Sequence, residues 1–169
     1  HLKVAPEHYS DEVLALMGKP HFAVFEAFES AFAQAARRAG KELYLVPYFI
    51  TGHPGCDMDQ ALRLGEYLLE RGWKLRQVQD YTPIPLSLSA AMYASGLDTQ
   101  GRRLHVPRGR SEKRLQMALV KYHDDALAPL ARDYWHQRGR GDLAAKIGAA
   151  PHAIKKRPAA KGRRRNSRR

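Results

Sequence analysis

The chain has 169 residues, 44% of them hydrophobic, which is enough for one domain with a real core and excludes disorder throughout. Its longest apolar runs are far too short to cross a bilayer, and its single cysteine excludes an internal disulfide and favours a cytoplasmic location. The formal net charge is +12, but nine of the 29 Lys and Arg residues lie in the last fifteen positions, so the excess belongs mainly to a tail.

The first forty residues predict a strand followed by two helices. Residues 2–5 have a strand-like pattern that runs into Pro6, Glu7 and His8. Ser10 can cap a short helix that ends near residue 17, and aromatic residues at helical spacing predict a longer helix over 22–38. Because the chain begins inside a strand, we expect it to be a piece of a longer protein, with a processed or tagged chain as the alternative.

The next forty residues continue this alternation. Residues 43–50 form a nearly continuous apolar run, typical of a strand buried on both faces, although Pro47 predicts an irregularity because it has no N–H to donate. Asp57 is a plausible cap for a helix over 57–71, and 77–81 predicts a third strand. Such an alternation is typical of βαβ units, so we expect 43–50 and 77–81 to be adjacent parallel strands.

After residue 81 the pattern changes to short helices. Residues 82–86 hold two prolines and predict a loop, 87–95 a short helix and 101–107 an extended arm. Ser111 is expected to cap a helix that ends near residue 123, and further helices are expected over 126–138 and 141–147. From residue 149 the composition predicts a disordered basic tail. We therefore expect three parts: the part with the three strands over 1–100, a helical extension over 101–148, and the tail over 149–169.

Four stretches in this order and spacing carry a family resemblance. They are Leu2-Lys3-Val4-Ala5-Pro6-Glu7-His8, Tyr44-Leu45-Val46-Pro47-Tyr48-Phe49-Ile50, His53-Pro54-Gly55-Cys56 and Val78-Gln79-Asp80-Tyr81-Thr82-Pro83. Together they resemble the YgiQ-type radical S-adenosylmethionine (SAM) family over roughly residues 2 to 148. The resemblance implies an α/β fold in which these strands are the last three βα units of a partial TIM barrel, with parallel strands and a family-specific C-terminal extension.

The resemblance also implies two cofactors, a [4Fe–4S] cluster and SAM, in a longer parent enzyme that cleaves SAM reductively. In the family, a CxxxCxxC motif supplies three thiolates to the cluster. Cys56 is the single cysteine here, so we expect the cluster ligands to lie in a missing N-terminal part and this chain alone to be catalytically incompetent. The resemblance supplies neither a substrate nor a reaction type.

The carboxyl ends of the strands are where sites of βα barrels lie. We expect this end to form one wall of the SAM and substrate pocket. The candidate cofactor-binding residues are Glu7, His8, Gly52, His53, Gly55 and Gln79. The glycines would allow close approach of the backbone, whereas a loop ion pair or a capping role is the alternative for the polar residues. Asp80 and Tyr81 are interpreted as structural rather than as an acid–base pair.

Two further patterns point to other functions. His53 and Cys56 have the spacing of a metal-ligand pair, but no second pair follows, so we expect a partly buried thiol with some reactivity instead of zinc. The tail suggests a nucleic-acid-binding module as an alternative function. Its candidate contacts are Lys155, Lys156, Arg157, Arg163, Arg164 and Arg165. A structural α/β domain without activity is the other alternative.

Overall fold

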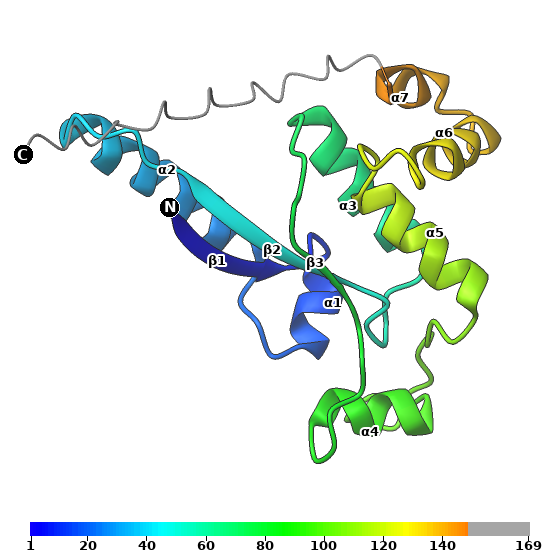
Figure 1. Cartoon of the computed structure of the whole chain (residues 1–169). Coiled ribbons are helices and arrows are strands. Elements are labelled where there is room, and N and C mark those ends of the chain that lie inside the picture. The colour runs from blue at the N-terminus through cyan, green and yellow to red at the C-terminus, as the bar shows by residue number, and fades with distance from the viewer. Residues whose placement is uncertain (149–169) are drawn as a thin grey trace, which may run out of the picture.

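A computed structural model of the chain describes residues 1–148, so the predicted basic tail lies outside the described residues (Figure 1). Residues 1–148 form a three-stranded parallel sheet and seven helices, which confirms the predicted α/β class. The strands are β1 (Leu2–Glu7), β2 (Leu45–Thr51) and β3 (Val78–Asp80). The helices are α1 (Asp11–Leu16), α2 (Phe22–Arg38), α3 (Met58–Glu70), α4 (Leu88–Ser95), α5 (Arg110–Val120), α6 (Ala128–Gln137) and α7 (Gly141–Lys146).

The strands lie in chain order, β1-β2-β3, and both neighbouring pairs are parallel. This confirms that the second and third predicted strands are adjacent and parallel. The expected irregularity at Pro47 is also present. Val4 lies opposite Pro47 and Glu7 opposite Phe49, so three steps along β1 match two along β2. The missing N–H of Pro47 thus coincides with a break in the regular ladder.

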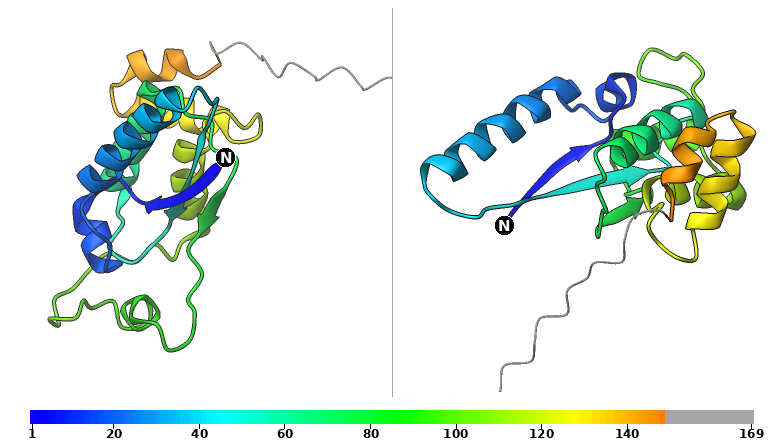
Figure 2. Two further views of the ribbon diagram at one scale, coloured as in Figure 1. Left: turned by 90° about the vertical axis from the view of Figure 1, so that its left-hand side faces the viewer. Right: turned by 90° about the horizontal axis from the view of Figure 1, so that it is seen from above.

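Helices α2 and α3, which connect β1 to β2 and β2 to β3, lie on the same face of the sheet. Tyr67 of α3 packs edge-on against Phe22 of α2, with ring centroids 5.0 Å apart, and Arg71 of α3 forms an ion pair of 2.7 Å with Glu29 of α2. Figure 2 shows α2 and α3 on one side of the strands and no helix of the described part over the other side of β1 and β2. Tyr48 and Gln79 meet on this uncovered face, where the Tyr48 hydroxyl donates to Gln79 Oε1 (2.5 Å).

Capping side chains fix several of the helix starts. Ser10 Oγ accepts from the N–H of Val13, and Asp57 forms a reciprocal capping box with Gln60 at the start of α3. At the start of α4, Ser87 Oγ accepts from the N–H of Ala90. The expectation that Ser111 caps the next helix is wrong, because α5 already begins at Arg110, after Gly109, without a side-chain cap.

One hydrophobic core serves the sheet and the C-terminal helices together. Phe49 of β2, Leu68 of α3, Leu119 of α5 and Trp135 of α6 are all buried in the same cluster. Helix α5 comes so close to α3 that a Cβ on Gly65 would lie 3.1 Å from the Leu119 carbonyl oxygen. The expected extension over 101–148 therefore shares its core with the strands. None of the helices within 1–148 has the length and apolarity needed to cross a bilayer.

Candidate functional site

His8 follows β1 directly and its side chain is fully buried. The N–H of Ser10 donates to His8 Nδ1 (2.9 Å), which assigns the ring proton to Nε2, and Nε2 lies 3.4 Å from Cys56 Sγ. Burial, and then the neighbouring His53, lower the pKa of His8 to about 3. The ring is therefore neutral at physiological pH, and both of its nitrogens are engaged inside the protein.

Cys56 lies at the end of the turn between β2 and α3 and is fully buried. Burial, together with the nearby carboxylates of Asp57 and Glu112, raises the pKa of its thiol to about 12. The expectation of a partly buried thiol is therefore wrong, and burial opposes the mild reactivity that a helix start would favour. The start of a helix does lower thiol pKa values in general, but desolvation outweighs that effect here.

Gln116 of α5 holds the same turn and was not expected from the sequence. It is fully buried, its Oε1 accepts from the N–H of Gly52 (2.9 Å) and its Nε2 donates to the carbonyl oxygen of Cys56 (3.0 Å). The Cys56 thiol lies 3.5 Å from the same Oε1. The C-terminal helices are thus tied to the carboxyl end of β2 by one amide side chain. The available sequence signal was a glutamine within a buried helix face that also carries Leu119 and Val120.

His53 is buried on the other side of this turn. Its Nδ1 donates to the carbonyl oxygen of Pro54 (2.7 Å), and its Nε2 accepts from the hydroxyl of Ser89 in α4 (2.8 Å). Burial lowers the pKa of His53, so this ring is neutral as well. His53 therefore anchors α4 to the end of β2.

Gly52 and Gly55 both have positive φ angles, +73° and +89°, which favour glycine. Their missing side chains also leave room for the protein's own groups. A Cβ on Gly52 would lie 2.7 Å from Asp80 Oδ1, and a Cβ on Gly55 would lie 2.1 Å from Leu16 Cδ1. The close approach to these two glycines that the sequence predicts is thus made by side chains of this same chain, Asp80 and Leu16.

Acidic and amide side chains remain at the strand ends. Glu7 has a φ of +66°, rare for a residue with a side chain; its Oε1 pairs with Lys19 (3.3 Å), and its buried Oε2 has no hydrogen-bond partner within 1–148. Gln79 is exposed on the uncovered face. Asp80 Oδ2 pairs with Lys113 (3.3 Å), whereas its buried Oδ1 also lacks a partner among the described residues.

The predicted site residues therefore separate into two groups. His8, Gly52, His53 and Gly55 form the interior support of the turn after β2, whereas Glu7 and Gln79 lie at the strand ends with unsatisfied or exposed polar atoms. Within residues 1–148, no three His, Cys, Asp or Glu side chains are grouped so that they could hold a metal ion. The unsatisfied oxygens of Glu7 and Asp80 mark the polar part of the site.

The fold and this site define an α/β chain whose parallel strands present their carboxyl ends beside a helical extension. The chain belongs to the family described as "Domain of unknown function (DUF3362)", whose pattern matches residues 76–169. No solved structure shows significant similarity to the chain.

Several proteins named UPF0313 are similar to the chain. One from Methanosarcina acetivorans is 40% identical over 143 residues, which cover 84% of this chain and 19% of the relative. One from Geobacter sulfurreducens is 47% identical over 123 residues (72% and 20%), and one from Clostridium perfringens is 37% identical over 154 residues (90% and 23%). UPF0313 is the YgiQ-like family, which confirms the resemblance at the level of the family. The chain spans about a fifth of the length of these relatives.

Proposed function

We propose that the chain is the C-terminal part of a larger radical SAM enzyme, and that the carboxyl ends of its strands form one wall of the SAM and substrate pocket. The observation that carries this proposal is the sheet, with parallel strands in chain order, both connecting helices on one face and the other face uncovered. In βα barrels the strands line the interior and the helices surround them. A doubly wound sheet has helices on both faces instead.

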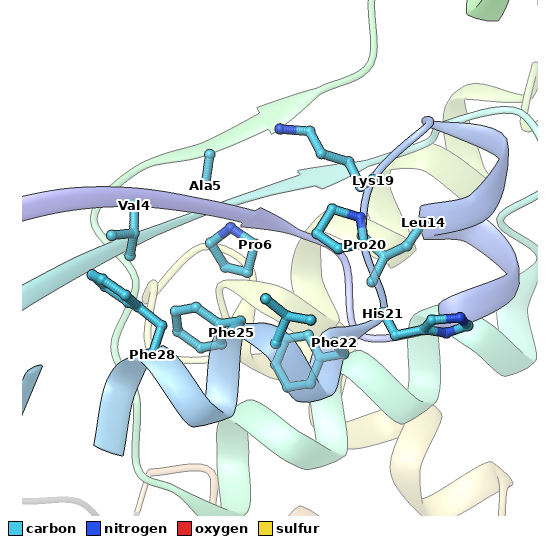
Figure 3. Close-up of a pocket in the computed structure, with 11 residues that line it drawn as sticks. Val4, Ala5, Pro6, Leu14, Lys19, Pro20, His21, Phe22, Phe25 and Phe28 are labelled. Atoms are coloured by element: carbon cyan, nitrogen blue, oxygen red, sulfur yellow. The ribbon is translucent and has the colours of Figure 1, made fainter. Parts of the chain in front are cut away.

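The surroundings of β1 support a continuation of the barrel before this strand. Three strands are too few to close a barrel, and one edge of β1 is unpaired among the described residues. A crevice of about 250 Å³ lies between β1 and α2, lined mainly by apolar side chains such as Val4, Pro6, Phe25 and Phe28 (Figure 3). A preceding βα unit would pair with β1 and cover this crevice. The relatives are long enough to contain such units, because the part that matches this chain is about a fifth of their length.

The residues of this chain do not fit an iron–sulfur cluster. Such a cluster needs thiolates, whereas Cys56 is the single cysteine, is fully buried and has a thiol pKa of about 12. In this proposal the cluster ligands belong to the missing N-terminal part, and Cys56 has a structural role.

The strand ends do fit a ligand such as SAM, which carries positive charge and several hydrogen-bond donors. Glu7 Oε2 and Asp80 Oδ1 are buried acceptors without a partner within 1–148, and Gln79 offers an exposed amide. When bound, SAM would supply the reactive group. The chain's own residues would bind and orient it, with His8 and His53 holding the turn behind the wall rather than contacting the ligand.

The test uses the longer protein that contains this chain, reconstituted with iron and sulfide. We expect 5′-deoxyadenosine to form from SAM, and we expect Glu7→Gln and Asp80→Asn each to weaken SAM binding about tenfold, as for the loss of a hydrogen bond to a charged group. Glu42→Gln, at an exposed position before β2, is the matched control and should bind normally. Absence of a CxxxCxxC motif upstream, or unchanged SAM affinity in both site variants, would contradict the proposal and favour a structural domain.

A further inference from the structure

Positive charge within the folded part is concentrated in one segment. Residues 101–114 contain six basic residues and one acid, whereas the rest of residues 1–148 contains 14 basic and 16 acidic residues. The six are Arg102, Arg103, Arg108, Arg110, Lys113 and Arg114. Outside this segment the folded part thus has a slight net negative charge, and the segment joins α4 to the first turns of α5 (Figure 1).

The segment is held firmly beside the carboxyl end of β3. The carbonyl oxygen of His105 accepts from the N–H of Gly55 (2.7 Å). The guanidinium of Arg108 donates to the carbonyl oxygen of Ala94 (3.2 Å) and lies over the Tyr93 ring, 5.1 Å from its centroid. The ammonium of Lys113 lies 3.3 Å from both Asp80 Oδ2 and the carbonyl oxygen of Tyr81. These contacts hold the segment that carries the cations next to the proposed pocket.

Four of the six basic residues have no acidic partner in the described part of the chain, and one of these four, Arg108, is held by a carbonyl oxygen and the Tyr93 ring. Arg102 pairs with Asp98 and Lys113 with Asp80, and Glu112, the acid of the segment, is bonded to His105 (2.5 Å). Arg103, Arg110 and Arg114 are exposed and form no ion pair within 1–148. We call these three residues the arginine surface.

The arginine surface carries an electrostatic cost that the fold does not relieve. Arg110 and Arg114 are four residues apart on α5, a spacing at which like charges destabilise a helix. Arg110 also lies in the first turn, where the helix dipole disfavours cations. A solvated helix face with no binding role has no need of this arrangement, whereas an anionic ligand would reverse both effects.

We propose that the arginine surface binds the phosphate backbone of a nucleic acid. All three side chains are arginine, whose planar guanidinium matches phosphate oxygens in bidentate geometry. Arg110 and Arg114 are separated by about 6 Å along the helix axis, so they can meet different phosphates of one strand. The proposal does not depend on SAM chemistry, and it concerns residues 103–114 and not residues 155–169.

The test measures binding of a fluorescently labelled 20-nucleotide RNA to the full chain by anisotropy at several salt concentrations. Arg110→Gln/Arg114→Gln is expected to lower the affinity about tenfold at low salt and to reduce the slope of log affinity against log salt by about two. Arg37→Gln/Arg38→Gln, at the exposed carboxyl end of α2, removes the same charge and should change the affinity less than twofold. Arg103→Gln gives a reading independent of helix stability, and its affinity should fall several-fold.

Three results would overturn the proposal. The first is parental affinity in Arg110→Gln/Arg114→Gln and in Arg103→Gln. The second is an equal loss in the α2 control, which would show that net charge alone matters. The third is loss of all binding when Lys155, Lys156 and Arg157 are changed to Gln while Arg110→Gln/Arg114→Gln has no effect, which would assign binding to the tail.

Discussion

At the scale of single residues, His8 makes the stability of the fold depend on pH. Its pKa is about 3 in the folded state, against 6.5 for a free histidine. As pH falls from 6.5 towards 3, His8 therefore binds a proton in the unfolded chain but stays neutral in the folded chain. The free energy of unfolding consequently falls, by about 1.4 kcal/mol per pH unit at most. We expect His8→Asn, whose side-chain oxygen can still accept from Ser10, to flatten this dependence.

The measurement is the free energy of unfolding in urea at pH 7.5 and pH 5.0. The parent should lose more stability between these values than His8→Asn. The variant His136→Asn is the control, because His136 is exposed and forms no ion pair within 1–148, so its loss should leave the parental difference intact. Identical pH dependence in His8→Asn and the parent would show that His8 is not buried in the neutral form.

Gln116 is the second residue with a large expected effect. Gln116→Leu keeps the size of the side chain but leaves the Gly52 N–H and the Cys56 carbonyl oxygen without their partner. Two buried, unsatisfied groups should destabilise the protein by about 2–5 kcal/mol. Met117→Leu, at a half-buried position beside it, should cost less than about 1.5 kcal/mol. If urea denaturation gives equal losses of unfolding free energy for the two variants, the hydrogen bonds of Gln116 to Gly52 and Cys56 contribute nothing specific.

Cys56 gives a simpler test, because its thiol is buried and protonated. A thiol reagent at pH 8 should label the folded protein very slowly and the urea-unfolded protein at once, since only the thiolate reacts. Mass spectrometry before and after unfolding measures the difference. Rapid labelling of the folded protein would mean that the turn after β2 opens readily.

At the scale of the elements, α3 and α5 make a close contact at Gly65. A side chain there would meet Leu119 at 3.1 Å, and the bulk of valine cannot be accommodated without separating the helices. We expect Gly65→Val to destabilise the protein by about 1–3 kcal/mol and to increase amide exchange in α5. Arg63→Val places the same residue on the exposed face of α3 and should cost less than about 1 kcal/mol. Equal exchange in both variants would contradict the tight contact.

Most of these elements could be predicted from local sequence, because local chemistry decides them. The caps at Ser10 and Asp57 and the disturbance at Pro47 need only a few neighbouring residues. The start of α5 was predicted wrongly because Ser111 resembles a cap, while the actual turn begins at Gly109. Local chemistry offers no means of separating these two positions.

The candidate site was less predictable, because burial decides it. Sequence position placed His8 and His53 at strand ends, but only their contacts with Cys56 and with Ser89 of α4 show that their ring nitrogens are used internally. The partner of Gly52 lies 64 positions away, in a helix whose register the sequence leaves open. The unsatisfied oxygens of Glu7 and Asp80 likewise become visible only in three dimensions.

At the scale of the whole molecule, the uncovered face and the unpaired edge of β1 predict self-association. Exposed strand edges template pairing with other chains. We expect the isolated chain to associate with increasing concentration in analytical ultracentrifugation, and Ile50→Lys, which adds a charge to the uncovered face next to Gln79, to reduce this association. Gln34→Lys on α2 adds the same charge elsewhere and should not. A strictly monomeric parent at high concentration would contradict the expectation.

The two hydrogen bonds of Gln116 to the turn after β2 also fix an order of events during protein synthesis. Gly52 and Cys56 leave the ribosome well before Gln116, which follows Gly52 by 64 residues. At translation rates of about 5–20 residues per second, the turn after β2 waits roughly 3–13 s for its partner. During that interval the Cys56 thiol is open to oxidants that the finished protein excludes. Oxidative damage to Cys56 should therefore occur mainly in nascent chains, and a sulfenic acid formed there would add an oxygen to a sulfur that lies 3.5 Å from Gln116 Oε1 in the folded protein.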